Sequence, residues 1–420
     1  MSDTKNYITS PGEVNVTRLE IKSSNGKLLD ISAIFADLTL YEDIFSNTMS
    51  GFILMQDSLD LLNILPMTGE ELLFVDLQTP TLKQQITKTF YIYKMSALST
   101  DKRKSTYILH FCSLELINSL NTKISKSFKN NISDTITTIL KDEKFLGSQK
   151  TFECEKTSNS YNVVVPYWTP LQTINWLSTK SLNNKNASNF LFFENNKEFR
   201  YSSIDLMVAA NPTREYINSD VNSHTITDDN EKKYSIVELI EMPITYDYIR
   251  NLSAGMYGGI LYTYDLTTKN IKKSTYDYID RFDLVNHTNK APLRTNSLFR
   301  NTSASLNFSL QNNYLNGSFN SQKIHDTLLQ RSSLLEQISA FRINIRVYGR
   351  TDIKAGQTIT YKTPKTAEIV KKEINTDADS EYFSGKYLIT AIKHSITNGQ
   401  HKMDMEIVSD SFVTNISNNK

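Results

Sequence analysis

Two stretches that lie far apart in the chain share one pattern of apolar and polar positions. The first is Gly69–Pro80, where "LLFVDLQTP" alternates, followed by a predicted hairpin at 90–112. The second is Gly356–Pro364, where "QTITYKTP" alternates, followed by a hairpin at 386–408. Alternation with a period of two is typical of strands with one buried face, and the polar segments between paired runs are typical of turns. The pattern predicts two similar antiparallel β-domains in one chain.

The surrounding runs extend each of these domains. In the first, strands flank the turn signal Asn25-Gly26, and a short helix over 58–65 is predicted, with Asp57 as its cap. We expect an antiparallel barrel over 14–115, after a flexible leader at 1–13. The alternating strand that begins at Phe341 leads into the second copy, so the second barrel is predicted as discontinuous. It comprises 220–250 with 337–410, followed by a tail at 411–420.

Helical spacing replaces alternation between the two β-domains. Helices are predicted over 114–120 and 133–141, the second with Ser133 as its N-cap. A third helix starts at the good cap pair Thr169-Pro170. Two aromatic strands then flank Asn195-Asn196. We therefore expect a mixed α/β domain over 116–219.

An inserted subdomain is predicted over 251–336. Its main feature is a pair of strands in which tyrosines recur at alternating positions, which favours cross-strand packing or a subunit interface over a sugar-binding surface. Residues 286–321 are rich in Asn, Ser and Thr and predict a long polar loop, before a helix over 324–338. The candidate interface residues are Tyr262, Tyr264, Tyr276 and Tyr278.

Together these elements predict a β-rich α+β fold with two similar antiparallel β-barrel domains, a mixed α/β domain and an inserted subdomain. The charges balance, with 46 Lys and Arg against 45 Asp and Glu, so the composition gives no support to a nucleic-acid or anionic-membrane partner. Two cysteines fit a reducing compartment without a disulfide framework. No run of about 18 apolar residues predicts a membrane span.

Candidate catalytic groups find little support in the sequence. The six histidines include no HExxH and no Cys/His quartet, although His394 and His401 could approach across their hairpin and share a metal. Cys112 and Cys154 lack the signature of a nucleophile. The adjacent carboxylates Glu70 and Glu71 point to opposite faces of a strand and are interpreted as a solvated loop, as is the pair at 228–229. The basic tip at 101–104 is interpreted as a solvated turn. We predict no enzyme activity, no cofactor and no metal site.

An ordered series of segments suggests a family. The series is "VPYWTPLQTINWLSTKSL", "FLFFENNKEFRYSSIDL", "NLSAGMYGGILYTYDLTTKNIKKSTYDYIDRF", "RSSLLEQISAFRINIRVYG" before "IKAGQTITY", and "FSGKYLITAIKHSITNGQHKMDMEIV". In this order they resemble the baseplate hub proteins of contractile-tailed bacteriophages of the T-even type and, more distantly, the hub-like part of type VI secretion spike proteins. The resemblance spans most of 14–412, and the strand from Gly69 to Pro80 is longer than its counterpart in the second copy.

The resemblance implies a structural protein of the virion, assembled in the host cytoplasm. It implies a homotrimer whose two barrels per chain form a pseudo-sixfold ring, with the central spike, the tail tube and the baseplate wedge proteins as partners. DNA would pass through the channel without specific binding, and no membrane insertion is expected. The alternatives are a receptor- or glycan-binding tail module, a hub component of a related contractile injection system, and a peptidoglycan hydrolase, for which the sequence offers no convincing carboxylate.

Overall fold

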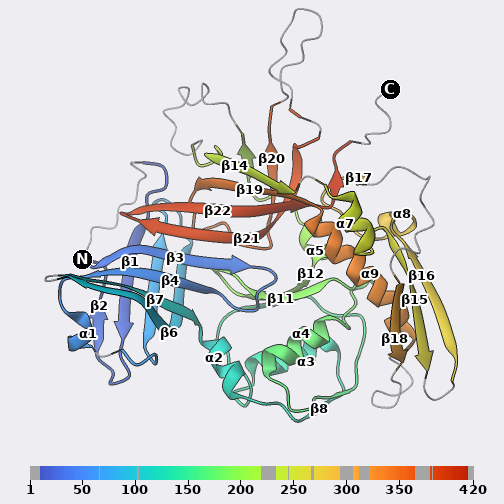
Figure 1. The fold of residues 1–420 in the computed structure, drawn as a ribbon, viewed down its shortest axis with the longest axis horizontal. Helices are drawn as coiled ribbons and strands as arrows, with labels where there is room; N and C mark the ends of the chain where they lie inside the picture. The colour runs from blue at the N-terminus through green and yellow to red at the C-terminus, as the bar shows by residue number, and fades with distance from the viewer. Residues whose placement is uncertain are drawn as a thin grey trace, which may run out of the picture.

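One large β-sheet runs through most of the chain in the computed structural model (Figure 1). The structure describes residues 10–65, 67–101, 104–218, 233–244, 246–265, 269–293, 306–311, 321–364, 379–380 and 382–414. The sheet has the order β14-β19-β22-β21-β3-β4-β7-β6-β5-β1-β2, and β20 pairs with β21 and β13 with β20 beside this path. Its strands are β1 (Asn15–Lys22), β2 (Leu28–Asp30), β3 (Phe35–Asp43), β4 (Ser50–Asp57), β5 (Leu72–Gln78), β6 (Gln85–Asp101), β7 (Lys104–Ser113), β13 (Glu215–Ile217), β14 (Leu239–Ile244), β19 (Phe341–Tyr348), β20 (Thr358–Lys362), β21 (Gly385–Thr397) and β22 (Gln400–Ser409).

The repeated sequence pattern folds into the same five-strand unit twice. In the first unit, the order β5-β6-β7-β4-β3 joins each strand antiparallel to the next. In the second unit, the order β20-β21-β22-β19-β14 does the same. The glycine before the first strand of each unit is left-handed, with φ of 91° at Gly69 and 82° at Gly356, a conformation that costs glycine little because it has no Cβ. The predicted duplication is therefore visible in the topology of the sheet.

The two units are joined edge to edge. Residues 37–43 of β3 pair antiparallel with residues 391–397 of β21. Ile396, near the tip of the second unit's hairpin, is fully buried in the core of the first unit. The strands predicted for two separate barrels are thus two parts of one sheet, and the strand pairs of the described residues do not close either part on itself.

A mixed layer of helices and short strands lies below the sheet in Figure 1. The predicted helices are present as α2 (Leu114–Asn121), α3 (Ile132–Lys141) and α4 (Pro170–Ser178). The Thr169 hydroxyl accepts a hydrogen bond from the Gln172 N–H, which confirms the predicted cap. The N-cap of α3 is Asn131 instead of Ser133, which lies inside the helix. The other elements of this layer are β8 (Ser127–Phe128), β9 (Phe152–Cys154), β10 (Val163–Val164), β11 (Phe190–Glu194), β12 (Phe199–Ser203) and α5 (Ile204–Ala209).

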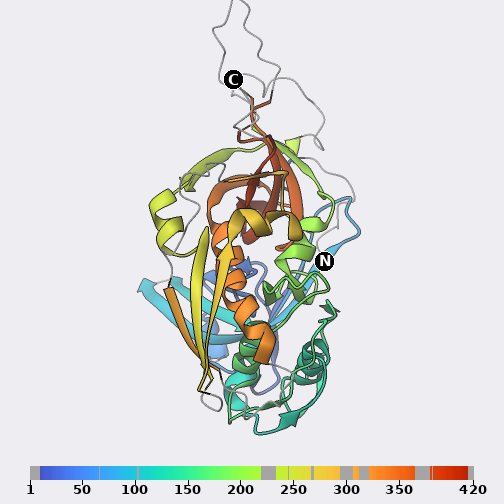
Figure 2. The same ribbon diagram turned by 90° about the vertical axis from the view of Figure 1, so that its right-hand side faces the viewer.

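The segment between β14 and β19 forms a small sheet beside a long helix, α9 (Ser321–Ser339) (Figure 2). Part of the predicted 286–321 loop is instead the strand β18 (Leu306–Gln311), which pairs parallel with β15 (Gly258–Asp265). Residues 294–305 and 312–320 lie outside the described residues. The remaining elements of this segment are α7 (Tyr248–Ser253), β16 (Ile271–Asp277), α8 (Tyr278–Arg281), η2 (Phe282–Leu284) and β17 (Ala291–Pro292). β17 pairs with β23 (Ser411–Phe412), which follows β22 in the chain.

The helix predicted over 58–65 is shorter, as α1 (Leu61–Ile64). Its start is delayed because the two carboxylate oxygens of Asp57 accept hydrogen bonds from the N–H groups of Leu59 and Leu61. Asp60 then takes a left-handed backbone, with φ of 58°, which a helix interior does not allow. None of the helices in the described part of the chain is long and apolar enough to span a membrane.

A buried ion network fixes the first unit to the mixed layer. The Glu194 carboxylate lies 2.9 Å from the Lys88 ammonium on β6 and 2.8 Å from the Lys150 ammonium, and it also accepts a hydrogen bond from the Ser113 hydroxyl. Burial alone would raise the pKa of Glu194, but the charges of Lys88 and Lys150 lower it to about 2. The carboxylate therefore stays ionised and holds two cations from different layers.

We expect Glu194→Gln to lower the free energy of unfolding by about 3 to 5 kcal/mol, because it leaves buried ammonium groups without their counter-charge. The matched control is Glu153→Gln, whose side chain is 51% exposed and whose loss should change stability by less than about 0.5 kcal/mol. Chemical denaturation of both variants measures the difference. Equal stability of Glu194→Gln and the unmodified protein would contradict the role of the network.

Candidate functional site

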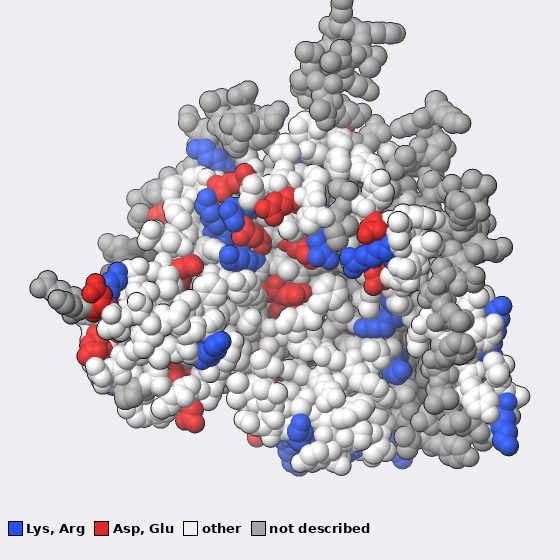
Figure 3. All heavy atoms as spheres, viewed as in Figure 1, with Lys and Arg blue, Asp and Glu red and all other residues white. Residues whose placement is uncertain are grey.

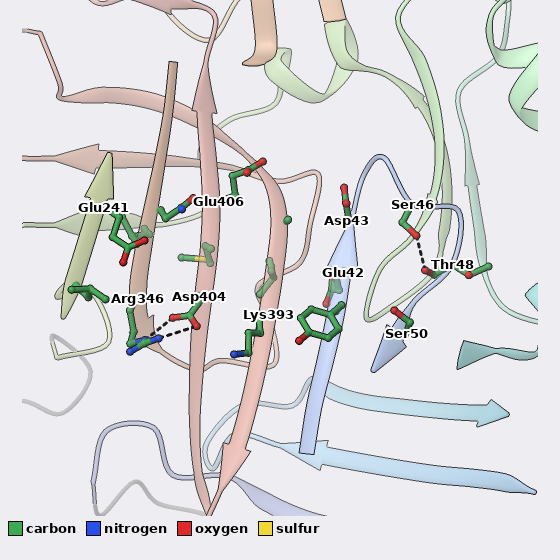
Figure 4. Close-up of a pocket in the computed structure, with 17 residues that line it drawn as sticks. Glu42, Asp43, Ser46, Thr48, Ser50, Glu241, Arg346, Lys393, Asp404 and Glu406 are labelled. Atoms are coloured by element: carbon green, nitrogen blue, oxygen red, sulfur yellow. Dashed lines mark hydrogen bonds and ion pairs between the residues drawn. The ribbon is translucent and has the colours of Figure 1, made fainter. Parts of the chain in front are cut away.

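An open groove of about 490 Å³ crosses the joint between the two units. We call it the junction groove; it is lined by residues of β3 and β4 from the first unit and of β14, β19, β21 and β22 from the second (Figure 4). In the same view as Figure 1, acidic and basic side chains gather over the strands of the second unit (Figure 3). The charged residues that line it are Asp43, Glu241, Arg346, Lys393, Asp404 and Glu406, with Glu42 reaching it from the core side.

The register of the sheet puts these side chains on one face. One row across the strands runs Tyr41, Lys393, Asp404, Arg346 and Leu239, each residue paired with the next. Residues directly opposite each other on neighbouring strands share a face. The sequence places charges at these outward positions, whereas the positions between them in β19 and β22 are apolar and buried.

Most charges in and around the junction groove are already paired. Arg346 makes a bidentate pair with Asp404, at 2.6 and 3.1 Å, and the Arg342 guanidinium lies 3.0 Å from the Glu406 carboxylate. Pairs this exposed contribute about 1 kcal/mol or less each. Burial raises the pKa of the Asp43 carboxyl, and the nearby Glu406 charge adds to the increase. This is a polar contact surface of mixed charge.

Three buried polar side chains lie on the core side of the same strands. His394 Nε2 is 2.9 Å from Glu42 Oε1, and His394 Nδ1 is 3.0 Å from His401 Nε2. The second oxygen of Glu42 accepts the N–H of Ala355. The contacts are satisfied when each histidine donates its Nε2–H along the chain towards Glu42. We call this set the junction relay, because Glu42 comes from the first unit and both histidines from the second.

The last ring of the junction relay is held in a closely fitted position. A Cβ built on Gly349 would lie 2.1 Å from the His401 ring, so only glycine fits beneath it. His401 Nδ1 is buried without a hydrogen-bond partner. Burial lowers the pKa of His401 well below its usual value, and the neighbouring His394 lowers it further. Protonation of His401 is therefore unfavourable in the folded chain.

The two histidines approach across their hairpin, as the sequence allowed, but they hydrogen-bond to each other. Within the described part of the chain, no group of three or more His, Cys, Asp or Glu side chains is arranged to hold a metal ion. Both ring nitrogens of His394 are in hydrogen bonds, to Glu42 and to His401, so the shared-metal alternative gains no support from the geometry.

The outward face of the first unit carries aromatic rings where the second unit carries charges. Tyr41 contacts Phe52, Phe52 contacts His110, and His110 contacts Tyr93, with ring centroids 6.3 to 6.4 Å apart at each step. The four rings come from β3, β4, β7 and β6. Tyr93 is half exposed. The outer surface of the sheet is therefore aromatic in one unit and charged in the other.

The four candidate interface tyrosines do not form one surface. Tyr276 and Tyr278 are buried inside the chain, and Tyr278 lies in α8 instead of a strand. Tyr262 and Tyr264 are only partly buried. Tyr262 pairs with Lys273 and Tyr276 with Gly259, so the tyrosines are not cross-strand partners. An interface role stays a prediction, and only Tyr262 and Tyr264 have surface available for it.

Other candidates from the sequence have structural roles in the described residues. Glu71 is fully buried, and its carboxylate accepts the N–H groups of the 68–70 turn, so its interpretation as a solvated loop was wrong. Glu70 is exposed. Burial raises the pKa of the Cys112 and Cys154 thiols to about 11, which makes both poor nucleophiles. The pair at 228–229 and the basic tip residues 102–103 lie outside the described residues.

The junction relay was not predicted as a unit, although the sequence contains a signal for it. Glu42 continues the alternation of Leu38 and Leu40, so it occupies an apolar phase, and His394 lies between Ile392 and Ile396 in the same way. A titratable residue at a core position of a strand requires a buried partner. Three such residues in paired strands would have indicated a buried polar cluster.

No protein-family model matches this sequence, and no curated protein matches it. Among solved structures, the tail protein from Neisseria meningitidis MC58 has a TM-score of 0.56 and 10% identity, covering 94% of this chain and 96% of that chain. The 43 kDa tail protein of prophage MuSo2 from Shewanella oneidensis has a TM-score of 0.57 and 10% identity, covering 94% and 99%. The fold of these two tail proteins therefore extends over nearly the whole chain.

A weaker similarity involves a chain of the Francisella PdpA–VgrG complex. It has a TM-score of 0.46 and 10% identity, covering 96% of this chain and 59% of that chain, and the assignment of the fold does not depend on it. The resemblance in the sequence predicted tail proteins as structural neighbours, and the two tail proteins above confirm this prediction.

The junction relay predicts loss of stability in acid. Because the folded pKa of His401 is depressed, the unfolded chain binds the proton first, and stability falls as the pH drops below about 6.5, the usual histidine value, by up to about 1.4 kcal/mol per pH unit. The variant His401→Gln keeps a hydrogen-bond donor towards His394. In this variant the contribution of His401 to the change of unfolding free energy with pH, between pH 6.5 and 5, should disappear. Urea unfolding at several pH values measures it, and an unchanged slope would contradict the assignment.

For His287 we expect the opposite pH dependence of stability. Burial alone would lower its pKa, but the Asp410 carboxylate, 2.7 Å from Nδ1, raises it. Its contribution is present below the unfolded pKa and is lost as the pH rises through the raised folded value. We expect His287→Gln to destabilise the protein more at pH 6 than at pH 9 in the same urea assay. A larger loss at pH 9 would show that His287 does not act as a buried cation.

Proposed function

We propose that this chain is a structural hub of a contractile phage tail, in which three copies form a ring with pseudo-sixfold symmetry. The ring would join a sixfold tail tube to a threefold central spike. The observation that carries the proposal is the five-strand unit that occurs twice in one chain, within a fold shared with two tail proteins, one of them from a prophage, over nearly their full lengths.

The duplication supports this role through symmetry. Three chains with two similar units each provide six similar positions around one axis, and the differences between the two units leave only threefold symmetry. A surface that the two units share can contact a sixfold partner, whereas a surface that only one of them has, such as the aromatic face of the first unit, suits a threefold partner. The proposed partners are the tail tube, the central spike and the baseplate wedge proteins.

The charges fit a channel that conducts DNA without binding it specifically. The outward face over the second unit mixes acidic and basic side chains, and Arg342 and Arg346 are paired with carboxylates. Phosphate binding requires unpaired cations in number. The proposal therefore includes no sequence-specific contact and no catalytic step, and it places the protein in the virion, at the baseplate, after assembly in the host cytoplasm.

A glycan-binding module remains the alternative of a different class. Such a module would use tyrosines such as Tyr262 and Tyr276 to stack on sugars, but Tyr276 is only 8% exposed. A stacking platform needs an accessible ring face, so the buried tyrosine weakens this alternative. A hub of a related contractile injection system would use the same ring and differs in what passes through it.

The proposal predicts a discrete trimer. Light scattering should give about three times the 48.1 kDa chain mass, either for the purified chain or after addition of the spike protein of the same tail. The spike alone, measured under the same conditions, is the control that assigns the mass increase. A monomer in both conditions would overturn the ring.

A further inference from the structure

Each five-strand unit has one strand edge without a neighbouring strand, although the equivalent edge of the other unit is paired. Within the chain, one such contact is made, between β3 of the first unit and the outer half of β21 in the second. In the strand order of the units, β14 of the second unit is equivalent to β3, and the outer half of β6 in the first unit is equivalent to the outer half of β21. β14 and the outer half of β6 lack a neighbour on that side in the described residues.

The outer halves of β6 and β21 are equivalent by register. Each strand pairs with its unit's first strand over its inner half and then has a register shift, at Tyr93 in β6 and at Thr390 in β21. In its outer half β6 has a second shift, between Ser96 and Ser99, which β21 lacks. Beyond the shift, residues 391–397 of β21 are covered by β3, and most are buried or half-buried. Residues 94–101 of β6 have no such cover, and all but Ser96 are exposed. Met95 and Leu98 are apolar and still 40% and 53% exposed.

The strands β3 and β14 differ in the same way. β3 lies between β4 and β21, and Leu38 and Leu40 are fully buried. β14 pairs with β19 on one side only, and Leu239 and Met242 are 44% and 37% exposed. A long strand edge with exposed apolar side chains is a template for pairing with another strand.

We propose that β14 of one copy of this chain pairs antiparallel with the outer half of β6 of the next copy, repeating the contact that β3 makes with β21. The proposal rests on the proposed ring and names the surface through which it closes. It explains why β3 and the outer half of β21 have neighbours within the chain, whereas β14 and the outer half of β6 do not. In the ring, β6 of one neighbouring chain would pair with β14, and β14 of the other neighbouring chain would pair with β6.

The internal contact fixes the register of the contact between chains. Ser395 pairs with Thr39 inside the chain. Ser99 takes the place of Ser395, because Ser99 pairs with Thr106 as Ser395 pairs with Lys402. Through the pairs of β4 and β19, Glu241 takes the place of Thr39. Glu241 of one chain should therefore lie opposite Ser99 of the next.

Pro243 limits the length of this contact. Proline has no N–H to donate, and β14 has a register irregularity between Glu241 and Ile244. The ladder between chains should therefore centre on residues 239–242 and be shorter than the internal one. A shorter ladder makes a weaker joint, so the ring should open between chains before the joint within a chain opens.

The test is a cysteine pair at the predicted register. In Ser99→Cys/Glu241→Cys, mild oxidation should produce disulfide-linked dimers and trimers on a non-reducing gel, because directly opposed residues have Cα atoms about 4.5 to 5.5 Å apart, within disulfide range. The native thiols should interfere little, since their pKa values are raised to about 11. The control Ser99→Cys/Ile240→Cys places the second thiol on the opposite face and should link at least tenfold less.

Single variants test the direction of the contact. Neither Ser99→Cys nor Glu241→Cys alone should form dimers, whereas an equimolar mixture should form dimers and stop there. Self-linking of either single variant would show a twofold contact and overturn the proposal. A trimer by light scattering that does not cross-link at the predicted register would overturn this edge contact while leaving the hub function intact. A chain that stays monomeric with and without spike would overturn both.

A charge on the bare edge gives an independent test. Leu98→Lys should weaken trimer formation at least tenfold, with an unchanged thermal midpoint of the separated chain, because the side chain is exposed there. Leu28→Lys is the matched control: Leu28 is 49% exposed on β2, at the end of the sheet that the proposal leaves free. Equal effects of the two variants on assembly would contradict a specific role for the β6 edge.

Discussion

The backbone pairing of β3 with β21 determines how the rest of the molecule is arranged. A strand inside a sheet needs hydrogen-bonding partners on both sides, since unpaired buried N–H and C=O groups are costly. Seven residue pairs between these strands meet that need for both units at once. The burial of Ile396, the junction groove and the junction relay all lie along this contact. Without it, each unit would have a second open edge, and the core of the first unit would lack Ile396.

Buried polar groups make this contact specific as well as stable. Glu42 reaches His394 only in the observed register, because a slip of one residue would turn Glu42 to the solvent face and put Tyr41 or Asp43 in its place. A carboxylate buried without its partner is strongly unfavourable. The junction relay thus selects one alignment of the two units, as Glu194 selects one position for the mixed layer.

The sequence predicts the elements of the fold better than their assembly. Alternation, the glycine before each alternating strand and the turn residues indicate both copies of the repeated unit, and Thr169-Pro170 marks the start of α4. Alternation says which face of a strand is buried but nothing about which strand lies beside it, so the edge contact between β3 and β21 could not be foreseen. Strand β18 has the alternating sequence LNFSLQ, but this run is only six residues long and lies in a stretch rich in Asn, Ser and Thr, so the sequence predicts it as part of a loop.

The candidate site shows the same limit. Counting tyrosines at alternating positions identified an aromatic region, but the register of β15 and β16 sets Tyr276 opposite Gly259 and turns its ring into the core. Glu42 and the two histidines each occupy an apolar phase of their strands, and this could have been read from the sequence. Their mutual contact depends on long-range pairing, which alternation alone does not define.

The distance in sequence between β3 and β21 has a consequence for synthesis. Their partners are separated by about 350 residues, so at roughly 5 to 20 residues per second β3 leaves the ribosome about 20 to 70 s before β21. During this interval the first unit lacks Ile396, and two of its edges, β3 and the outer half of β6, are bare. Nascent chains on one polysome therefore expose complementary strand edges to each other. The pairing of β21 with β3 ends this exposure for β3.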